Sequence, residues 1–196
     1  FMDQDTVTHL GHSPLLERLH LIQEAGTDKT ELLRQMACAE KRGVAGLWQM
    51  FIDNDPGQPD RYIAFVEQGG LSLPDESYYR LDDFAEIRDA FVRHLSRVAD
   101  LLGDRIPPDF ASQVMAVETE IARTHWDQVR CRDAHATYNL MTLEQWRGSI
   151  GEFPLTVWLD GIGLRDSQVQ EVVIRQPSAV EAWPHIWNEL SGEHLS

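Results

Sequence analysis

The sequence has no long apolar run, few cysteines and no excess of basic charge, and each absence excludes a class of protein. No stretch approaches the roughly 18 consecutive apolar residues that a membrane helix requires, so we expect no membrane segment. The formal net charge of -15, from 17 basic and 32 acidic residues, argues against nucleic-acid binding. Two cysteines, Cys38 and Cys131, are too few for a disulfide framework, although one bridge between them stays open.

Catalytic motifs are missing as well. No histidine belongs to a His-Glu-x-x-His motif, whose spacing places two imidazoles on one helix face around zinc. A Gly-x-Ser-x-Gly nucleophile motif and a Gly-x-x-x-x-Gly-Lys phosphate loop are also absent from the sequence. The histidines searched are His9, His12, His20, His94, His125, His135, His185 and His194. We therefore expect no catalytic, cofactor-binding or metal-binding residue in this chain.

Two weaker pairs of possible ligands remain. His9 and His12 lie three residues apart at the expected entrance to a helix, and the sequence indicates no third ligand. His185 and Glu189 lie four apart and could share a divalent ion, but this spacing more often gives an ordinary surface pair on a helix. Neighbouring carboxylates on a helix do not face one another, which argues against a glycosidase-type acid and base. The carboxylate pairs concerned are Glu118/Glu120 and Asp82/Asp83.

What is present is the composition of a soluble globular domain. The chain has 196 residues, and a chain of this length buries roughly 70% of its unfolded surface in one core. Apolar residues recur mainly at helical spacing, with capping residues before them and glycine after them. The expected helices cover residues 13–26, 28–43, 82–103, 107–126, 142–146, 153–159 and 178–190, the last one interrupted near Pro184.

A different pattern follows the first two expected helices. Residues 47–52 and 62–66 are short aromatic and β-branched runs, separated by a turn-rich loop at residues 53–60. This pattern predicts an antiparallel hairpin, and Val172–Ile174 predicts one further short strand. The fold class is therefore mainly α: a single multi-helix lobe over residues 1–196 with a small antiparallel β-hairpin.

One segment resembles a known protein family. Residues 68–79 read Gln-Gly-Gly-Leu-Ser-Leu-Pro-Asp-Glu-Ser-Tyr-Tyr, and they follow Asp53 and residues 60–63 at a fixed spacing. This combination resembles the strand-loop signature of the neprilysin, endothelin-converting enzyme and bacterial oligopeptidase O family of zinc metallopeptidases. Further similar segments are residues 118–122 with Trp126, residues 132–133, residues 138–142, and Val173 with residues 176–177. The turn at residues 56–59 and Cys131 depart from the family pattern.

The residues of this run also suggest what it does. Gly69 and Gly70 permit backbone angles that are closed to other residues, and Pro74 favours an extended turn. Tyr78 and Tyr79 can anchor the run through their rings, with their hydroxyls on polar partners. We interpret the run as a loop fixed onto the helical core, in preference to a direct contact with substrate.

The resemblance implies that this chain is the N-terminal, non-catalytic helical portion of a zinc metalloendopeptidase. In that family the lobe covers the active-site chamber, so its expected partners are the catalytic lobe of the same protein and peptide substrates. Zinc is expected in the missing catalytic domain, and this portion should be inactive alone. Phe1 is not an initiator methionine, and we expect the chain to be a fragment with an exposed apolar face. Both a cytoplasmic and a secreted location stay open.

Two alternatives from other classes remain. A helical protein-interaction module could use the same scaffold without catalysis, and the sequence does not separate it from a peptidase lobe. An enzyme in its own right would have to use His185 and Glu189, and it is the weakest of the three hypotheses.

Overall fold

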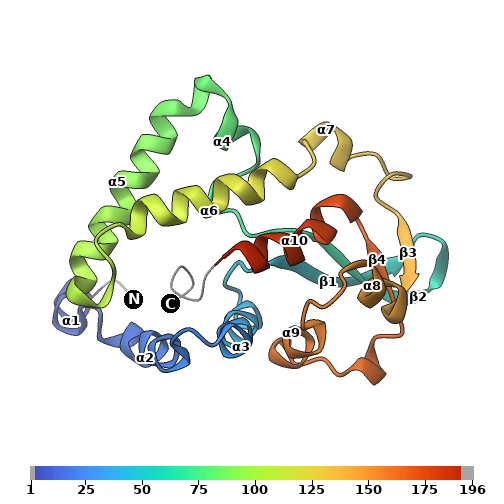
Figure 1. Ribbon diagram of the computed structural model, residues 1–196, viewed down its shortest axis with the longest axis horizontal. Coiled ribbons are helices and arrows are strands. Elements are labelled where there is room, and N and C mark those ends of the chain that lie inside the picture. Colours follow the sequence, from blue (N-terminus) through green and yellow to red (C-terminus); the bar gives the residue numbers. More distant parts are fainter. Residues whose placement is uncertain (1–2, 191–196) are drawn as a thin grey trace.

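The computed structural model describes residues 3–190, together with all side chains in that range except that of Asp104. Figure 1 shows two long helices that form a V-shaped arm above a second helical layer, with a sheet beside both. The arm consists of α5 (Ala85–Leu102) and α6 (Phe110–Thr124), and the second layer of α1 (Gln4–Leu10), α2 (Leu16–Ala25) and α3 (Lys29–Glu40). Among the described residues, no helix has the length and apolar character needed to cross a bilayer.

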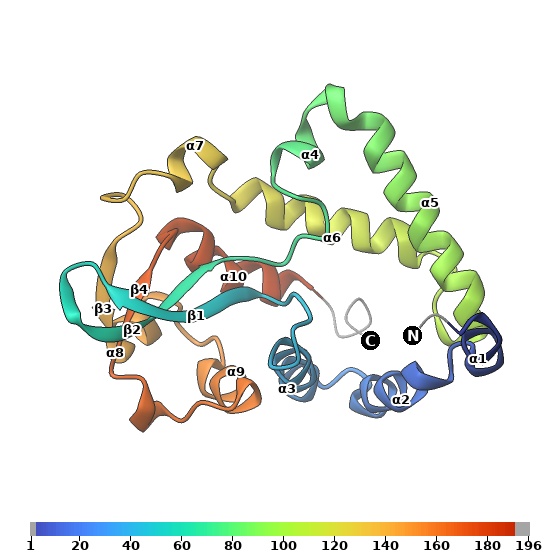
Figure 2. The same ribbon diagram turned by 180° about the vertical axis from the view of Figure 1, so that it is seen from behind.

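The sheet has four strands in the order β1-β2-β4-β3 (Figure 2). β1 (Trp48–Asp55) and β2 (Gln58–Gln68) form the predicted antiparallel hairpin, and β4 (Glu171–Ile174) confirms the further short strand. β4 runs parallel to β2, and it pairs antiparallel with β3 (Asn139–Thr142), which the apolar pattern did not indicate. The molecule is mainly helical as predicted, but the hairpin is half of a mixed sheet.

The expected loop at residues 53–60 is wrong, because the strands continue through it to a turn at residues 56–57. The side chain of Asp55 is fully buried and holds this turn together. It accepts hydrogen bonds from the Gly57 amide (2.8 Å), Arg61 Nε (2.7 Å) and the Tyr138 hydroxyl (2.6 Å). The hydrogen bond from Tyr138 is the main reason that the pKa of Asp55 is lowered to about 2. These contacts, of which the one with Tyr138 is long-range, override the poor strand propensity of Asp, Asn and Pro.

The predicted helices exist, although their ends move by several residues. Asp28 caps α3 by accepting from the amides of Thr30 and Glu31. The final helix, α10 (Pro177–Glu189), runs unbroken through Pro184, so the expected interruption is wrong. α1 was not predicted. The shorter helices are α4 (Ser77–Arg80), α7 (Gln128–Cys131), α8 (Leu143–Ser149) and α9 (Leu155–Ile162).

α8 begins with a capping box, in which side chain and backbone bond reciprocally. Thr142 Oγ1 accepts from the Gln145 amide at 3.1 Å, and the Thr142 amide donates to Gln145 Oε1 at 2.8 Å. We expect Thr142→Ala to lower the free energy of unfolding by about 1 kcal/mol. Thermal or urea unfolding of the two proteins measures this. A loss below about 0.3 kcal/mol would show that packing alone holds the start of α8.

The core lies between one sheet face and helices α3, α8, α9 and α10. Its centre is a cluster of three indoles, since Trp48 lies 5.4 Å from Trp146 and 5.1 Å from Trp158 between ring centroids. α3 packs against α9, and Gly161 permits this approach, because a Cβ there would lie 2.5 Å from the Cβ of Ala37. Cys38 and Cys131 are both free, so the bridge left open by the sequence does not form.

Candidate functional site

The loop that carries the family resemblance, residues 69–79, is called the signature loop here. It leaves β2 and crosses close to α10, where Gly70 has a φ of +87°. A Cβ at Gly70 would lie 2.9 Å from Cζ2 of Trp183. Both the backbone angle and the space therefore require glycine at this position.

A buried carboxylate on α6 binds the middle of the signature loop. Glu118 accepts hydrogen bonds from the Ser72 amide (3.2 Å), from Ser72 Oγ (2.6 Å) and from the Tyr79 hydroxyl. The Tyr79 oxygen in turn accepts from the Leu73 amide at 3.0 Å. Burial, and then the hydrogen bond to Glu118, raise the pKa of Tyr79. The hydroxyl is thus a donor to Glu118 at ordinary pH, and the cluster ties the loop to α6.

The two ends of the signature loop are held in the same way. Directly before the loop, the side chain of Gln68 forms two hydrogen bonds with the backbone of Trp126. Its Nε2 donates to the carbonyl oxygen at 3.0 Å, and its Oε1 accepts from the amide at 2.8 Å. At the other end, Asp75 accepts from the Ser77 amide (2.8 Å) and Gln128 Nε2 (2.6 Å). The loop therefore joins the sheet to the α6–α7 connection.

His125 belongs to this anchoring set. Its Nε2 lies 3.0 Å from the carbonyl oxygen of Gly69, which can only accept, so this nitrogen carries the proton. Burial lowers the pKa of His125 to about 4, and the ring is neutral at ordinary pH. Its role here is that of a fixed hydrogen-bond donor. The contacts of residues 68–79 agree with the interpretation of a loop fixed onto the helical core.

Sequence reasoning missed the role of Glu118, because it considered this residue as a possible acid-base partner of Glu120 and as part of the similar segment 118–122, and not as a hydrogen-bond acceptor for the signature loop. The structure places the two on different sides of α6, with Glu118 buried and Glu120 exposed. A signal was available, since Glu118 lies four residues after Val114 and three before Ile121 on the apolar side of the expected helix. A carboxylate in that stripe indicates a buried polar contact.

The role of Gly70 gives a direct prediction. We expect Gly70→Ala to lower the free energy of unfolding by roughly 1–3 kcal/mol, from the unfavourable φ and the contact with Trp183. The matched control is Gly148→Ala within α8, where nothing lies within 4 Å of the added Cβ. That control should be neutral or stabilising by up to about 1 kcal/mol. Chemical unfolding of both variants measures the difference, and equal effects would contradict the assigned role of Gly70.

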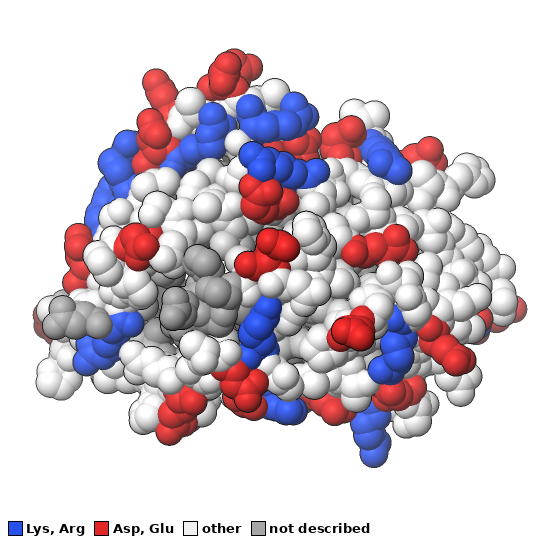
Figure 3. Space-filling view, viewed as in Figure 1, with Lys and Arg blue, Asp and Glu red and all other residues white. Residues whose placement is uncertain are grey.

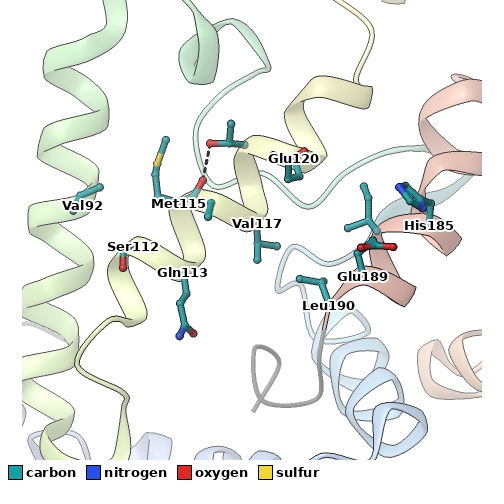
Figure 4. Close-up of a pocket in the computed structure, with 12 residues that line it drawn as sticks. Val92, Ser112, Gln113, Met115, Val117, Glu120, His185, Glu189 and Leu190 are labelled. Carbon is teal, nitrogen blue, oxygen red and sulfur yellow. Dashed lines mark hydrogen bonds between the residues drawn. The ribbon is translucent and has the colours of Figure 1, made fainter.

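A groove of about 650 Å³ separates α6 from the end of α10 (Figure 4). The lining between the two helices is apolar at Val117 from α6 and Ile186 from α10, and Val92 of α5 lines the hollow on the other side of α6. His185 and Glu189 lie on the α10 wall, and the α6 wall includes Glu120. We call this feature the α6–α10 groove; its other lining residues are Ser112, Gln113, Met115, Ala116, Thr119 and Leu190.

A second hollow, of about 450 Å³, adjoins this groove. It lies among α2, α3, α6, α10 and the signature loop, and it shares Gln113, Val117 and Leu190 with the groove. Most of its lining is apolar, and Ser72 and Glu118 from the anchoring cluster lie at its edge. The signature loop thus helps to shape a largely apolar interior surface.

Helices α1, α2 and α5 expose apolar side chains. On α5 only Leu102 is buried, and Leu101 is 74% exposed. α1 has no buried residue, and α2 buries only Ala25. In Figure 3 the charged side chains are interspersed, with broad uncharged areas between them on this face. The exposed apolar side chains on α1, α2, α5 and the turn between α1 and α2 are Val7, Leu10, Leu15, Leu16, Leu21, Ile87 and Leu101.

The possible metal ligands do not come together. His9 lies at the end of α1 and His12 just after it, whereas His185 and Glu189 lie on α10. Within residues 3–190, no group of three or more His, Cys, Asp or Glu side chains could hold a metal ion. The described residues provide hydrogen-bonded anchoring of the signature loop and an apolar surface beside it.

Comparison with known proteins gives consistent matches. A family model described as "Peptidase family M13" matches residues 1–196. The human protein "Membrane metallo-endopeptidase-like 1" is 27% identical over 170 residues, which cover 76% of this chain and 22% of the relative. The "Endothelin-converting enzyme homolog" of Locusta migratoria is 25% identical over 197 residues, which cover 90% of this chain and 26% of the relative.

Solved structures agree with these matches. The Mycobacterium tuberculosis zinc metalloprotease ZMP1 in complex with an inhibitor superimposes with a TM-score of 0.91 at 31% sequence identity. That match covers 98% of this chain and 30% of the protease. The chain therefore spans less than a third of the length of these relatives.

Proposed function

The chain belongs to peptidase family M13, as its N-terminal portion, and from this membership we propose that it is the non-catalytic helical lobe of a zinc metalloendopeptidase. In this proposal the lobe docks on the catalytic part of the same protein and covers its active-site chamber. Peptides and short unfolded segments enter the chamber, and folded proteins are excluded.

Zinc does not fit the residues of this chain that the structure describes. Tetrahedral protein zinc sites use three or four nitrogen, sulfur or oxygen ligands, and the described residues bring together no such set. His185 and Glu189 supply two donors at most on the wall of an apolar groove. We therefore assign no metal-dependent step to this chain, and we propose that zinc binds in the catalytic part.

The observation that carries the proposal is the apolar surface that the arm and the second helical layer leave uncovered. A monomeric soluble protein seldom exposes so many large apolar side chains on neighbouring helices unless a partner covers them. The anchoring of the signature loop supports the same role, because Glu118 and His125 fix the arm relative to the sheet. A rigid lobe can exclude large substrates and can open as one body to admit small ones.

An association experiment tests the proposal. The chain is expressed together with ZMP1 from which the matched N-terminal portion has been removed, and the two are purified through a tag on the chain. We expect a complex that cleaves a short peptide in a zinc-dependent manner, whereas the chain alone with added zinc cleaves nothing.

Other outcomes separate the alternatives. Association without cleavage would favour a protein-interaction module on the same scaffold. Cleavage by the chain alone would show an enzyme in its own right and overturn the assignment of a non-catalytic lobe. Failure to associate would remove the support for docking.

A further inference from the structure

The α6–α10 groove has the dimensions needed to accommodate a third helix between α6 and α10. Its α6 wall extends from Ser112 to Glu120, which is about 12 Å of helix at 1.5 Å per residue. Its α10 wall comes from His185, Ile186 and Glu189, and Leu190 directly after the helix extends it. Apolar side chains from both helices form the floor between these walls, so that a helix could pack against two others at once, at the usual spacing of 8–10 Å.

The two carboxylates that line the groove are Glu120 and Glu189. Glu120 on one wall and Glu189 on the other are both exposed, and none of the described residues that line the groove is Lys or Arg. Arg123, one turn along α6 and outside the lining, forms an ion pair with Glu120. Glu189 lies at the end of α10, where the helix dipole adds to its negative potential. An apolar floor between acidic walls complements an apolar helix face with basic flanks.

We propose that the α6–α10 groove binds an amphipathic helix with an apolar face and basic flanks, supplied by the part of the M13 polypeptide outside this chain. The inference rests on the proposed docking of the lobe and names the partner segment at that surface. In the ZMP1 relative, this chain matches 30% of the polypeptide, so most of that protein lies outside the matched portion.

The probe is a synthetic 15-residue helical peptide with leucine on one face and lysine on its flanks, labelled with fluorescein. Its binding to the chain is followed by fluorescence anisotropy at two salt concentrations. A second peptide keeps the leucine face and replaces every lysine by glutamate. We expect the lysine peptide to bind at least tenfold more tightly than the glutamate peptide, with a weaker preference at high salt.

Variants locate the binding site. The double variant Glu120→Gln with Glu189→Gln should weaken the lysine peptide about fivefold to tenfold, as expected for two partly exposed ion pairs. The matched control, Glu17→Gln with Glu152→Gln, removes the same charge at exposed positions away from the groove, and should leave binding unchanged. Val117→Gln should weaken both peptides, because it places a polar group on the apolar floor.

Three results would overturn the inference: equal binding of the two peptides, an equal loss in the control variant, or no effect of Val117→Gln. The second of these would indicate attraction by the net charge of -15 alone. The peptide assay contains no catalytic part, so it tests the groove independently of the proposed function. If the peptides do not bind as expected but the ZMP1 experiment gives association and cleavage, helix binding at the groove is rejected and the proposed function is retained.

Discussion

Replacing Glu118 by alanine is expected to lower the free energy of unfolding by about 3–5 kcal/mol. The carboxylate is buried and accepts hydrogen bonds from the Ser72 amide, the Ser72 hydroxyl and the Tyr79 hydroxyl. Its removal leaves these donors of the signature loop without their partner, and the hydroxyl of Tyr79 is buried, whereas Ser72 is exposed. Each buried unsatisfied polar group costs about 1–3 kcal/mol.

Two variants control this measurement in urea unfolding. Glu120→Ala changes the same residue type two positions along α6, but its side chain is exposed and its ion pair with Arg123 is at the surface. It should cost less than about 1 kcal/mol. Glu118→Gln retains one carbonyl acceptor and should recover part of the loss. A Glu118→Ala variant as stable as Glu120→Ala would contradict the anchoring role of Glu118.

Glu40 is expected to contribute to the free energy of unfolding, and this contribution should fall as pH rises. This carboxyl closes the corner between α3, β1 and α9, because it accepts from the Leu47 amide at 2.7 Å and from the Trp158 indole at 2.8 Å. Burial raises the pKa of Glu40 from 4.5 to about 7, although these hydrogen bonds oppose the shift. In the described part of the chain, no cation pairs with it.

The sign follows from proton linkage. The folded state binds the proton of Glu40 more tightly than the unfolded state, so the stabilisation is complete below pH 4.5 and is lost as pH rises through about 7. A shift of this size corresponds to about 2 kcal/mol after allowance for partial exposure to solvent. Unfolding free energies measured between pH 4.5 and pH 8.5 give this component as a difference between variants.

Glu40→Gln should remove the pH-dependent component. The amide accepts only one of the two hydrogen bonds, so the variant is also expected to be less stable at low pH. The difference between wild type and variant should therefore shrink by about 2 kcal/mol as pH rises. Glu152→Gln, an exposed substitution of the same kind, should leave the pH profile of the wild type unchanged. A constant difference for Glu40→Gln would contradict the buried site.

The local elements of this fold could be predicted from the sequence because their signals are local. Asp28 and Thr142 cap helices where their side chains can reach the next amides, and the hairpin follows from two β-branched and aromatic runs. The strand β3 could not be predicted, since a four-residue run becomes a strand only through its pairing with β4. The turn at residues 56–57 depends on Tyr138, which lies 83 positions from Asp55.

In the candidate site, too, the local features could be predicted from the sequence and the long-range contacts could not. The sequence marked the signature loop and the two glycines at its start, and Gly70 has the positive φ that this residue type permits. It could not indicate that Glu118 binds this loop, because the contact joins residues 46 positions apart. The α6–α10 groove likewise could not be predicted from the sequence. His185 and Glu189 were visible as a helical pair, but the facing wall comes from another helix.

The most direct test of the docked-lobe account is a chimera in which this chain replaces the matched N-terminal portion of ZMP1, with which it shares 31% sequence identity and a TM-score of 0.91. Zinc-dependent cleavage is measured on a short peptide and on the same sequence within a folded protein. We predict cleavage of the peptide and protection of the folded protein, and no activity from ZMP1 without the replaced portion. A folded, zinc-loaded chimera that cleaves neither substrate, or both equally well, would contradict the account.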